Sequence, residues 1–174
     1  MTAIHLKGTY NLAAMYNKDK NLNKVRTIAD YQFGKGCGEV LFPDGVTFLL
    51  SRTNRVRQIL HNGVRIATVR ARDGMLTLSI AGAIVLHRIL PFPSYRVVVC
   101  EDAAPFASKG KTVFAKHIIS MDSELRAGEE VLVVDVSDKL LATGQLLLSP
   151  HEALSIGRGA AVDIRNGINE EKDG

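Results

Sequence analysis

Six arginines between residues 52 and 72 are the side chains of this sequence best suited to binding a polyanion. Arg52, Arg55 and Arg57 flank a short expected loop, and Arg65, Arg70 and Arg72 lie on or just past the strand expected after it. Arginine holds phosphate through a two-pronged fork of N–H donors, so a cluster of this kind can bind a nucleic-acid backbone. We predict RNA contacts for Arg52, Arg55, Arg57, Arg70 and Arg72. The alternative is that several of them only keep one face of a sheet soluble.

A second candidate for chemistry is the glycine-rich stretch Gly34–Gly38, which contains Lys35 and Cys37. Exposed backbone N–H groups could cradle a phosphate there, and Lys35 is a further candidate RNA contact. However, no Ser or Thr follows the lysine and no apolar strand precedes the glycines, so a nucleotide-binding P-loop is not predicted. A turn between two elements is the favoured interpretation. A small enzyme that uses Cys37 as nucleophile remains an alternative, because the nearby lysine would lower the thiol pKa.

Composition and charge support a polyanionic partner for the first half of the chain. Residues 1–94 carry 13 Lys or Arg and 5 Asp or Glu, a net charge of +8, whereas residues 95–174 carry 9 and 13, a net charge of −4. The five histidines are scattered without zinc-ligand spacing, so we predict no metal and no cofactor. No apolar run is long enough to span a membrane, and the two cysteines fit reduced thiols in a cytoplasmic protein.

The first half must position the arginines, and its pattern predicts helices packed on an antiparallel meander. Apolar residues at three- and four-residue steps predict a helix over 21–33, and the first 20 residues are expected to be irregular apart from a short helix at 11–16. Asn62-Gly63 and Asp73-Gly74 predict two-residue hairpin turns. We expect strands at 46–51, 56–61, 64–71 and 75–80, and a helix at 82–90.

The second half is expected to be a small β-barrel that begins after the proline-rich connector at 91–94. Strands are predicted at 96–100, 113–119, 131–136, 140–147 and 161–165, with Phe114 packed inside the barrel. Ser149, Pro150 and Glu152 form a capping-box signal for a short helix that Gly157 ends. The fold class is therefore α+β. We divide the chain into an extension (1–20), a meander domain (21–93), a barrel domain (94–166) and a polar tail (167–174).

The order of several motifs resembles two adjoining domains of one family of tRNA-modifying enzymes. The stretches Gly110–Lys116, Arg126–Val131, Leu141–Gly144 and Gly157–Val162 resemble the PUA domain, an RNA-binding β-barrel. Upstream of them, Tyr31–Gly38, Ser51–Arg57 and Val69–Gly74 stand in the order seen before that barrel in archaeosine tRNA-guanine transglycosylase and the related archaeosine synthase. The chain departs from the family pattern at Asn54, where Gly is usual, and at Glu129, where PUA barrels often have Asp.

The resemblance implies a part that holds tRNA rather than one that does chemistry. In that family the C-terminal domains hold tRNA so that a D-loop guanine reaches a separate catalytic barrel, which has no counterpart here. The resemblance places Gly110, Lys111, Phe114, Lys116, Arg158 and Gly159 near the cleft for the RNA end. The implied function is the non-catalytic, tRNA-binding subunit of a split transglycosylase, with a separate catalytic subunit as its partner. The alternative is an independent PUA protein in RNA maturation or ribosome biogenesis.

Overall fold

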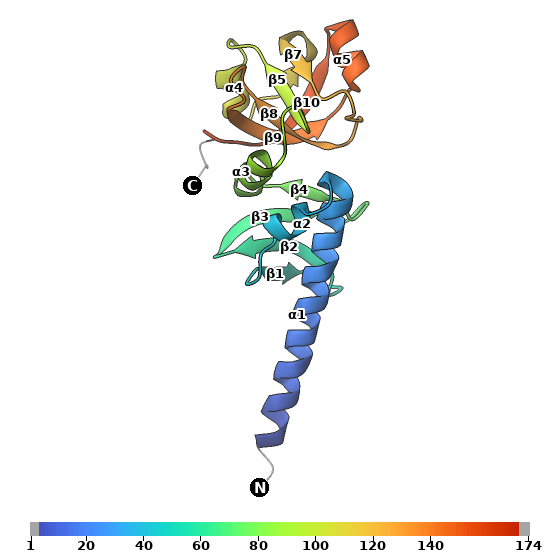
Figure 1. Ribbon diagram of the computed structural model, residues 1–174, viewed down its shortest axis with the longest axis vertical. Helices are drawn as coiled ribbons and strands as arrows, with labels where there is room; N and C mark the ends of the chain where they lie inside the picture. Colours follow the sequence, from blue (N-terminus) through green and yellow to red (C-terminus); the bar gives the residue numbers. More distant parts are fainter. Residues whose placement is uncertain (1–3, 171–174) are drawn as a thin grey trace.

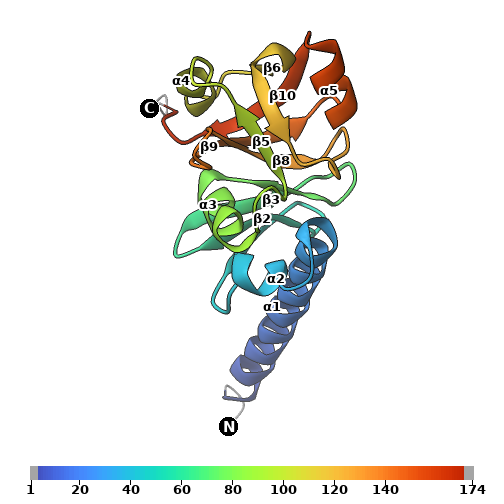
Figure 2. The ribbon, with the colours of Figure 1, turned by 45° about the horizontal axis from the view of Figure 1, so that its top comes forward.

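The computed structural model describes the backbone of residues 4–170 and the side chains from residue 18 onward. The chain forms two sheets stacked end to end, with helices around them (Figures 1 and 2). The first part contains α1 (Ile4–Phe33), α2 (Cys37–Leu41), β1 (Thr47–Leu50), β2 (Val56–His61), β3 (Val64–Val69), β4 (Leu76–Leu78) and α3 (Ile80–Ile89). The second part contains β5 (Arg96–Val99), α4 (Ala104–Ser108), β6 (Val113–Phe114), η1 (Ala115–His117), β7 (Ile118–Met121), β8 (Glu130–Val134), β9 (Leu140–Leu146), α5 (Pro150–Ile156) and β10 (Ala160–Gly167).

The first sheet is the expected antiparallel meander, in the order β1-β2-β3-β4. Asn62 and Gly63 both have positive φ, at 51° and 77°, so the tight turn predicted between β2 and β3 is confirmed. The start of the chain differs from expectation, because α1 begins at Ile4 and runs without a break to Phe33. The N-terminal half of α1 projects away from both sheets (Figure 1). The irregular structure expected over residues 1–20 is therefore wrong from residue 4 onward, except at 11–16, where a short helix was expected.

The second sheet is a nearly closed barrel in the order β6-β10-β9-β8-β5-β7, and only β5 and β8 run parallel. The strand predicted at 113–119 is split in the structure, because β6 pairs with β10 whereas β7 pairs with β5. The 3-10 turn η1 makes this corner. At α5 the capping box of Ser149 and Glu152 is confirmed, and Gly157 ends the helix in the left-handed region with φ 61°.

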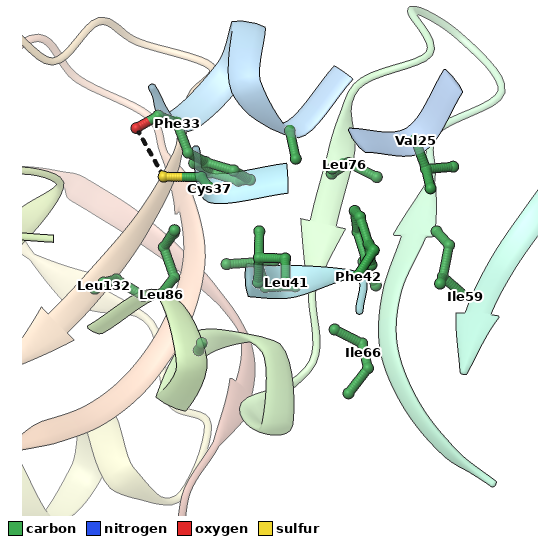
Figure 3. Packing of buried hydrophobic residues seen from close by; sticks show 14 of the residues in the cluster. Val25, Phe33, Cys37, Leu41, Phe42, Ile59, Ile66, Leu76, Leu86 and Leu132 are labelled. Carbon is green, nitrogen blue, oxygen red and sulfur yellow. Dashed lines mark hydrogen bonds between the residues drawn. The ribbon is translucent and has the colours of Figure 1, made fainter. Parts of the chain in front are cut away.

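One hydrophobic core continues across the junction of the two parts. Val25, Phe42 and Ile59 of the first part share a buried cluster with Leu132, Val134 and Leu140 of the barrel. Figure 3 shows Leu132 of the barrel beside Leu86 of α3. Both belong to the same cluster as the side chains that α1 and α2 supply. Such continuous burial is the main stabilising contribution at a domain junction. The two parts therefore hold a fixed relative position.

Polar contacts also cross the junction, and the central one is made by Glu130, which is only 2% exposed. Its Oε1 accepts hydrogen bonds from the Leu78 backbone N–H at 2.9 Å and from the Thr143 hydroxyl at 3.3 Å. Its Oε2 lies 3.5 Å from Arg165 Nε but accepts no hydrogen bond within the described part of the chain. Burial raises the pKa of Glu130 to about 7, and the donors offset only part of that effect.

This buried carboxyl predicts a characteristic pH dependence of stability. Since its pKa is about 7 in the folded chain and near the ordinary value of 4.5 in the unfolded chain, the folded state holds the extra proton between those limits. The free energy of unfolding should therefore fall as pH rises through this window, and the Glu130 contribution should amount to about 3 kcal/mol. We expect Glu130→Gln to remove that part of the slope in urea titrations from pH 4 to pH 8.

The exposed Glu101 supplies the matched control for this measurement. The variant Glu101→Gln should reproduce the pH profile of the unmodified chain. Stability profiles of Glu130→Gln and the unmodified chain that run parallel would contradict the argument, because they would mean that the Glu130 carboxyl titrates alike in the folded and unfolded chains.

Candidate nucleic-acid interface

Four of the predicted arginines meet at one cavity of about 620 Å³, which we call the basic pocket. Helix α1 forms one wall, the loop between β1 and β2 forms another, and the loop between β3 and β4 closes it. Its lining residues are Lys24, Val25, Ile28, Ser51, Thr53, Arg55, Val56, Arg57 and the run 69–74. The meander thus brings Arg55, Arg57, Arg70 and Arg72 together, as the predicted basic surface required.

The loop between β1 and β2 presents Arg55 at the mouth of the basic pocket. The Ser51 hydroxyl accepts hydrogen bonds from the backbone N–H groups of Thr53 and Arg55, at 3.3 and 3.2 Å. Asn54 adopts φ 55°, a left-handed conformation that Gly and Asn tolerate best. Asn54 therefore meets the same backbone requirement as the glycine usual at this position.

The loop between β3 and β4 is wider than the predicted two-residue turn, and this widening shapes the pocket. Only Gly74 of the Asp73-Gly74 pair has positive φ, and the backbone hydrogen bonds of the loop join Arg70 to Gly74 and Met75. The Asp73 carboxylate accepts the Met75 N–H at 3.0 Å, and this bond fixes the loop. The side chain of Asp73 thus replaces the tight turn with a loop that places two arginines at the pocket.

The electrostatics of the basic pocket favour an anionic ligand. Its lining contains five cations, Lys24 and the four arginines, against the single carboxylate of Asp73. Burial opposes ionisation of Asp73, but the Met75 N–H and the guanidinium groups of Arg70 and Arg72 outweigh it and lower its pKa. One carboxylate cannot neutralise five cations, so the cavity has a strong positive potential.

The guanidinium of Arg70 is the deepest of these cations. Its side chain is 16% exposed, and its Nε lies 3.1 Å from Asp73 Oδ1. Despite this proximity, neither Nε nor Nη1 makes a hydrogen bond to any described residue, because the contact is poorly aligned. Arg70 therefore keeps two donors without hydrogen-bond partners among the described residues, although both are covered from solvent.

Lys35 and Arg52 do not line the basic pocket. Arg52 is exposed in the turn between β1 and β2, and Lys35 is exposed in the loop between α1 and α2. Lys24 was missed by the sequence analysis, although it does line the pocket. Nothing in the local pattern distinguishes it from other helix-surface lysines. Only the packing of α1 on the meander brings it there.

The glycine-rich loop at 34–38 is a structural turn in this fold. The Asp30 carboxylate accepts hydrogen bonds from the N–H groups of Gly36 and Gly38, at 3.0 and 2.7 Å, so these donors are already used. The loop leads into α2 rather than into a strand. Burial and the Asp30 charge raise the pKa of Cys37, which disfavours the reactive thiolate. The arrangement gives no support to a catalytic Cys37.

A second candidate surface is an apolar cleft of about 390 Å³ in the barrel part. Lys111 and Phe114 line it together with Phe106 of α4. Phe114 was predicted to pack inside the barrel, but it is 47% exposed. Val113 takes the inward position instead, since neighbouring residues of a strand point to opposite faces.

Phe106, which is 63% exposed, was not among the residues predicted for this region. Of the other residues predicted in this region, Gly159 lies next to β6, where its carbonyl accepts the Ala115 N–H at 2.9 Å. Arg158 is exposed in the same loop. Gly110, with φ 81°, and the exposed Lys116 flank the cleft in sequence but do not line it.

Comparison with known sequences finds a matching family for each of the two parts of the chain. Residues 23–93 match the family described as the patch-forming domain C2 of tRNA-guanine transglycosylase, and residues 95–168 match the PUA domain family. The chain is 48% identical to a tRNA-guanine(15) transglycosylase of Methanothermobacter thermautotrophicus over 148 residues, which cover 84% of this chain and 23% of the relative. It is 51% identical to that of Thermococcus onnurineus, over 85% of this chain and 25% of the relative. The chain thus spans about a quarter of the length of these relatives.

Solved structures show the same fold at low sequence identity. A hypothetical protein from Pyrococcus horikoshii superposes with a TM-score of 0.67 at 22% identity, over 87% of this chain and 92% of that one. A conserved PUA domain protein from Thermoplasma acidophilum gives 0.60 at 20% identity, over 89% and 92%. Within the described residues, no helix combines the length and apolar character needed to cross a membrane.

Proposed function

Since this chain corresponds to the C-terminal region of tRNA-guanine(15) transglycosylases, with their C2 and PUA domains, we propose that it binds tRNA and positions it for base exchange in the D-loop. The observation that carries the proposal is the basic pocket, where the C2 part gathers five cations around one cavity. The relatives are named for their action on guanine 15 of tRNA, so the polyanion we assign to this pocket is tRNA.

The two parts have different roles in this proposal. The meander, residues 21–93, supplies the charge that holds the phosphate backbone, and the barrel, residues 94–166, supplies a local site for an RNA end. The apolar cleft with Phe106 and Phe114 supports this second role, because exposed aromatic rings can stack on unpaired bases. The continuous core between the parts supports joint action on one tRNA molecule.

In its finer form, the proposal gives the catalytic step to a separate polypeptide. The chain itself would then be a non-enzymatic subunit of an archaeosine tRNA-ribosyltransferase, acting in the cytoplasm where tRNA is modified. The chain is similar to about a quarter of the length of these transglycosylases, and this form assigns the remaining part, with the catalytic step, to the partner.

Reconstitution tests this form directly. The tagged chain is isolated from its native cell, and the bound proteins and RNA are identified. The partner and the chain are then assayed for exchange of labelled guanine into tRNA, alone and mixed. We expect exchange only in the mixture. Full activity of the partner alone would contradict the subunit role, and recovery of RNA without any transglycosylase would favour an independent PUA protein in RNA maturation.

A further inference from the structure

We propose that the basic pocket binds a single unpaired nucleotide of the RNA, with its phosphate on Arg70 and its nucleoside against Ile28 and Val69. This proposal rests on the proposed function and deepens it, because it assigns a ligand to one cavity instead of a charged surface. Three features of the pocket carry it: the cluster of cations around Arg70, the size of the cavity, and its partly apolar floor.

The Arg70 guanidinium nitrogens that lack partners favour an anionic hydrogen-bond acceptor in the pocket. Arg70 Nε and Nη1 lack hydrogen-bond partners among the described residues and are covered from solvent, so a phosphate reaches them only when the covering side chains move aside. Leaving buried polar groups unsatisfied is destabilising, and most of all for a charged group. A phosphate oxygen can accept from the guanidinium fork, and Arg55, Arg57 and Arg72 line the same cavity to balance the remaining charge.

The volume of the cavity argues for more than a phosphate. A cavity of about 620 Å³ falls within the range of roughly 300–1,000 Å³ that is usual for sites of whole small molecules. A phosphate on the outside of a duplex would leave most of this space unfilled, since its base is held in the stack. A nucleotide can bring its base and ribose along only when it is unpaired or turned out of the helix.

The floor of the cavity supplies the surface that a nucleoside needs. Ile28 of α1 and Val69 of β3 line the pocket, and both are only partly buried against the core beneath them. Exposed apolar surface beside a cluster of cations suits a ligand that is charged at one end and flat and weakly polar at the other. A nucleotide has this combination, whereas an inorganic anion does not.

Nuclear magnetic resonance of the intact chain can test this assignment. The ¹⁵N-labelled guanidinium of Arg70 and the ¹³C-labelled methyl groups of Ile28 and Val69 report on the two ends of the ligand. We expect a nucleoside 5′-monophosphate to shift all three signals, inorganic phosphate to shift only the Arg70 signal, and an unphosphorylated nucleoside to bind far more weakly. Unlabelled tRNA should displace the monophosphate.

Two variants separate the ends of the ligand. Arg70→Gln should weaken binding of the monophosphate about tenfold or more, as expected for loss of a charged hydrogen-bonding group. Ile28→Ala should weaken binding of the monophosphate but leave that of inorganic phosphate unchanged. Arg88→Gln, which changes an exposed arginine outside the pocket, serves as the control. The fold of each variant is checked by its methyl spectrum.

The outcomes distinguish this inference from the proposed function. If the monophosphate fails to bind, or shifts no methyl signal, the nucleotide assignment is overturned even though tRNA binding can stand. If the monophosphate binds but tRNA neither binds nor displaces it, the pocket is a site for free nucleotides. That result would overturn both the RNA assignment and the proposed function.

Discussion

Replacing Arg55, Arg57 and Arg72 together with Gln should lower tRNA affinity about 100-fold or more at low salt. These three exposed arginines line the basic pocket, and each hydrogen bond to a charged group contributes about 1.5–3 kcal/mol. Loss of three phosphate contacts should also reduce the slope of log affinity against log salt by about 2–3, since each contact contributes roughly 0.7–0.9. Filter binding between 50 and 300 mM salt measures both quantities.

The control variant removes the same number of positive charges from the surface outside the basic pocket. Arg88, Arg126 and Lys139 are also exposed and lie outside the basic pocket. Their joint replacement by Gln should leave the salt slope nearly unchanged. Equal losses in the two triple variants would show that net charge, and not the pocket, determines tRNA binding. Arg52 is left out of the test set because the structure places it outside the pocket lining.

Local sequence signals were sufficient where a few neighbouring residues determine the backbone. The Asn62-Gly63 turn and the capping box at Ser149 follow from the φ preference of two residues and from one hydroxyl–backbone bond. Asp73-Gly74 looked like the same kind of turn, but there the Asp73 side chain accepts the Met75 N–H and pairs with Arg70. These side-chain contacts outweighed the dipeptide preference.

Features that depend on packing between distant segments were beyond the sequence analysis. Phe114 was misplaced because alternation along a strand shows two faces but not which one is inward. The clustering of arginines was predictable from the meander, whereas the cavity itself required α1, which contributes Lys24 and Ile28. The continuous core shared with the barrel was likewise not predicted, since no local pattern indicates contacts between residues such as Leu86 and Leu132.

The largest stability effect should come from Arg96, whose side chain is 1% exposed at the junction of the two parts. Its Nη2 donates to the carbonyls of His87 and Leu90 at 2.8 and 3.1 Å, and its Nη1 donates to that of Ser94 at 2.9 Å. Its Nε donates to Asp138 Oδ1 of the barrel at 3.2 Å. One guanidinium thus joins the end of α3, the connector and the β8–β9 turn.

We expect Arg96→Met to lower the free energy of unfolding by about 3–5 kcal/mol, because it removes a buried charged group that donates four hydrogen bonds. Methionine preserves much of the volume, so the loss reports the unsatisfied carbonyls and the Asp138 carboxylate rather than a cavity. Asp138→Asn should cost less, because Asn keeps the acceptor oxygen and tolerates the φ of 58° at this turn. Guanidinium titrations followed by two spectroscopic probes measure both variants.

The exposed Arg88 provides the control, since Arg88→Met removes a nearby positive charge without touching the junction contacts. A loss of under 1 kcal/mol in Arg96→Met would show that the junction is held by its apolar core alone.

The Arg96→Met variant also links stability to function. If tRNA must contact both parts at a fixed spacing, Arg96→Met should bind tRNA more weakly even under conditions where it remains folded, because a looser junction must be ordered on binding. Unchanged affinity in the folded variant would mean that the two parts bind tRNA independently.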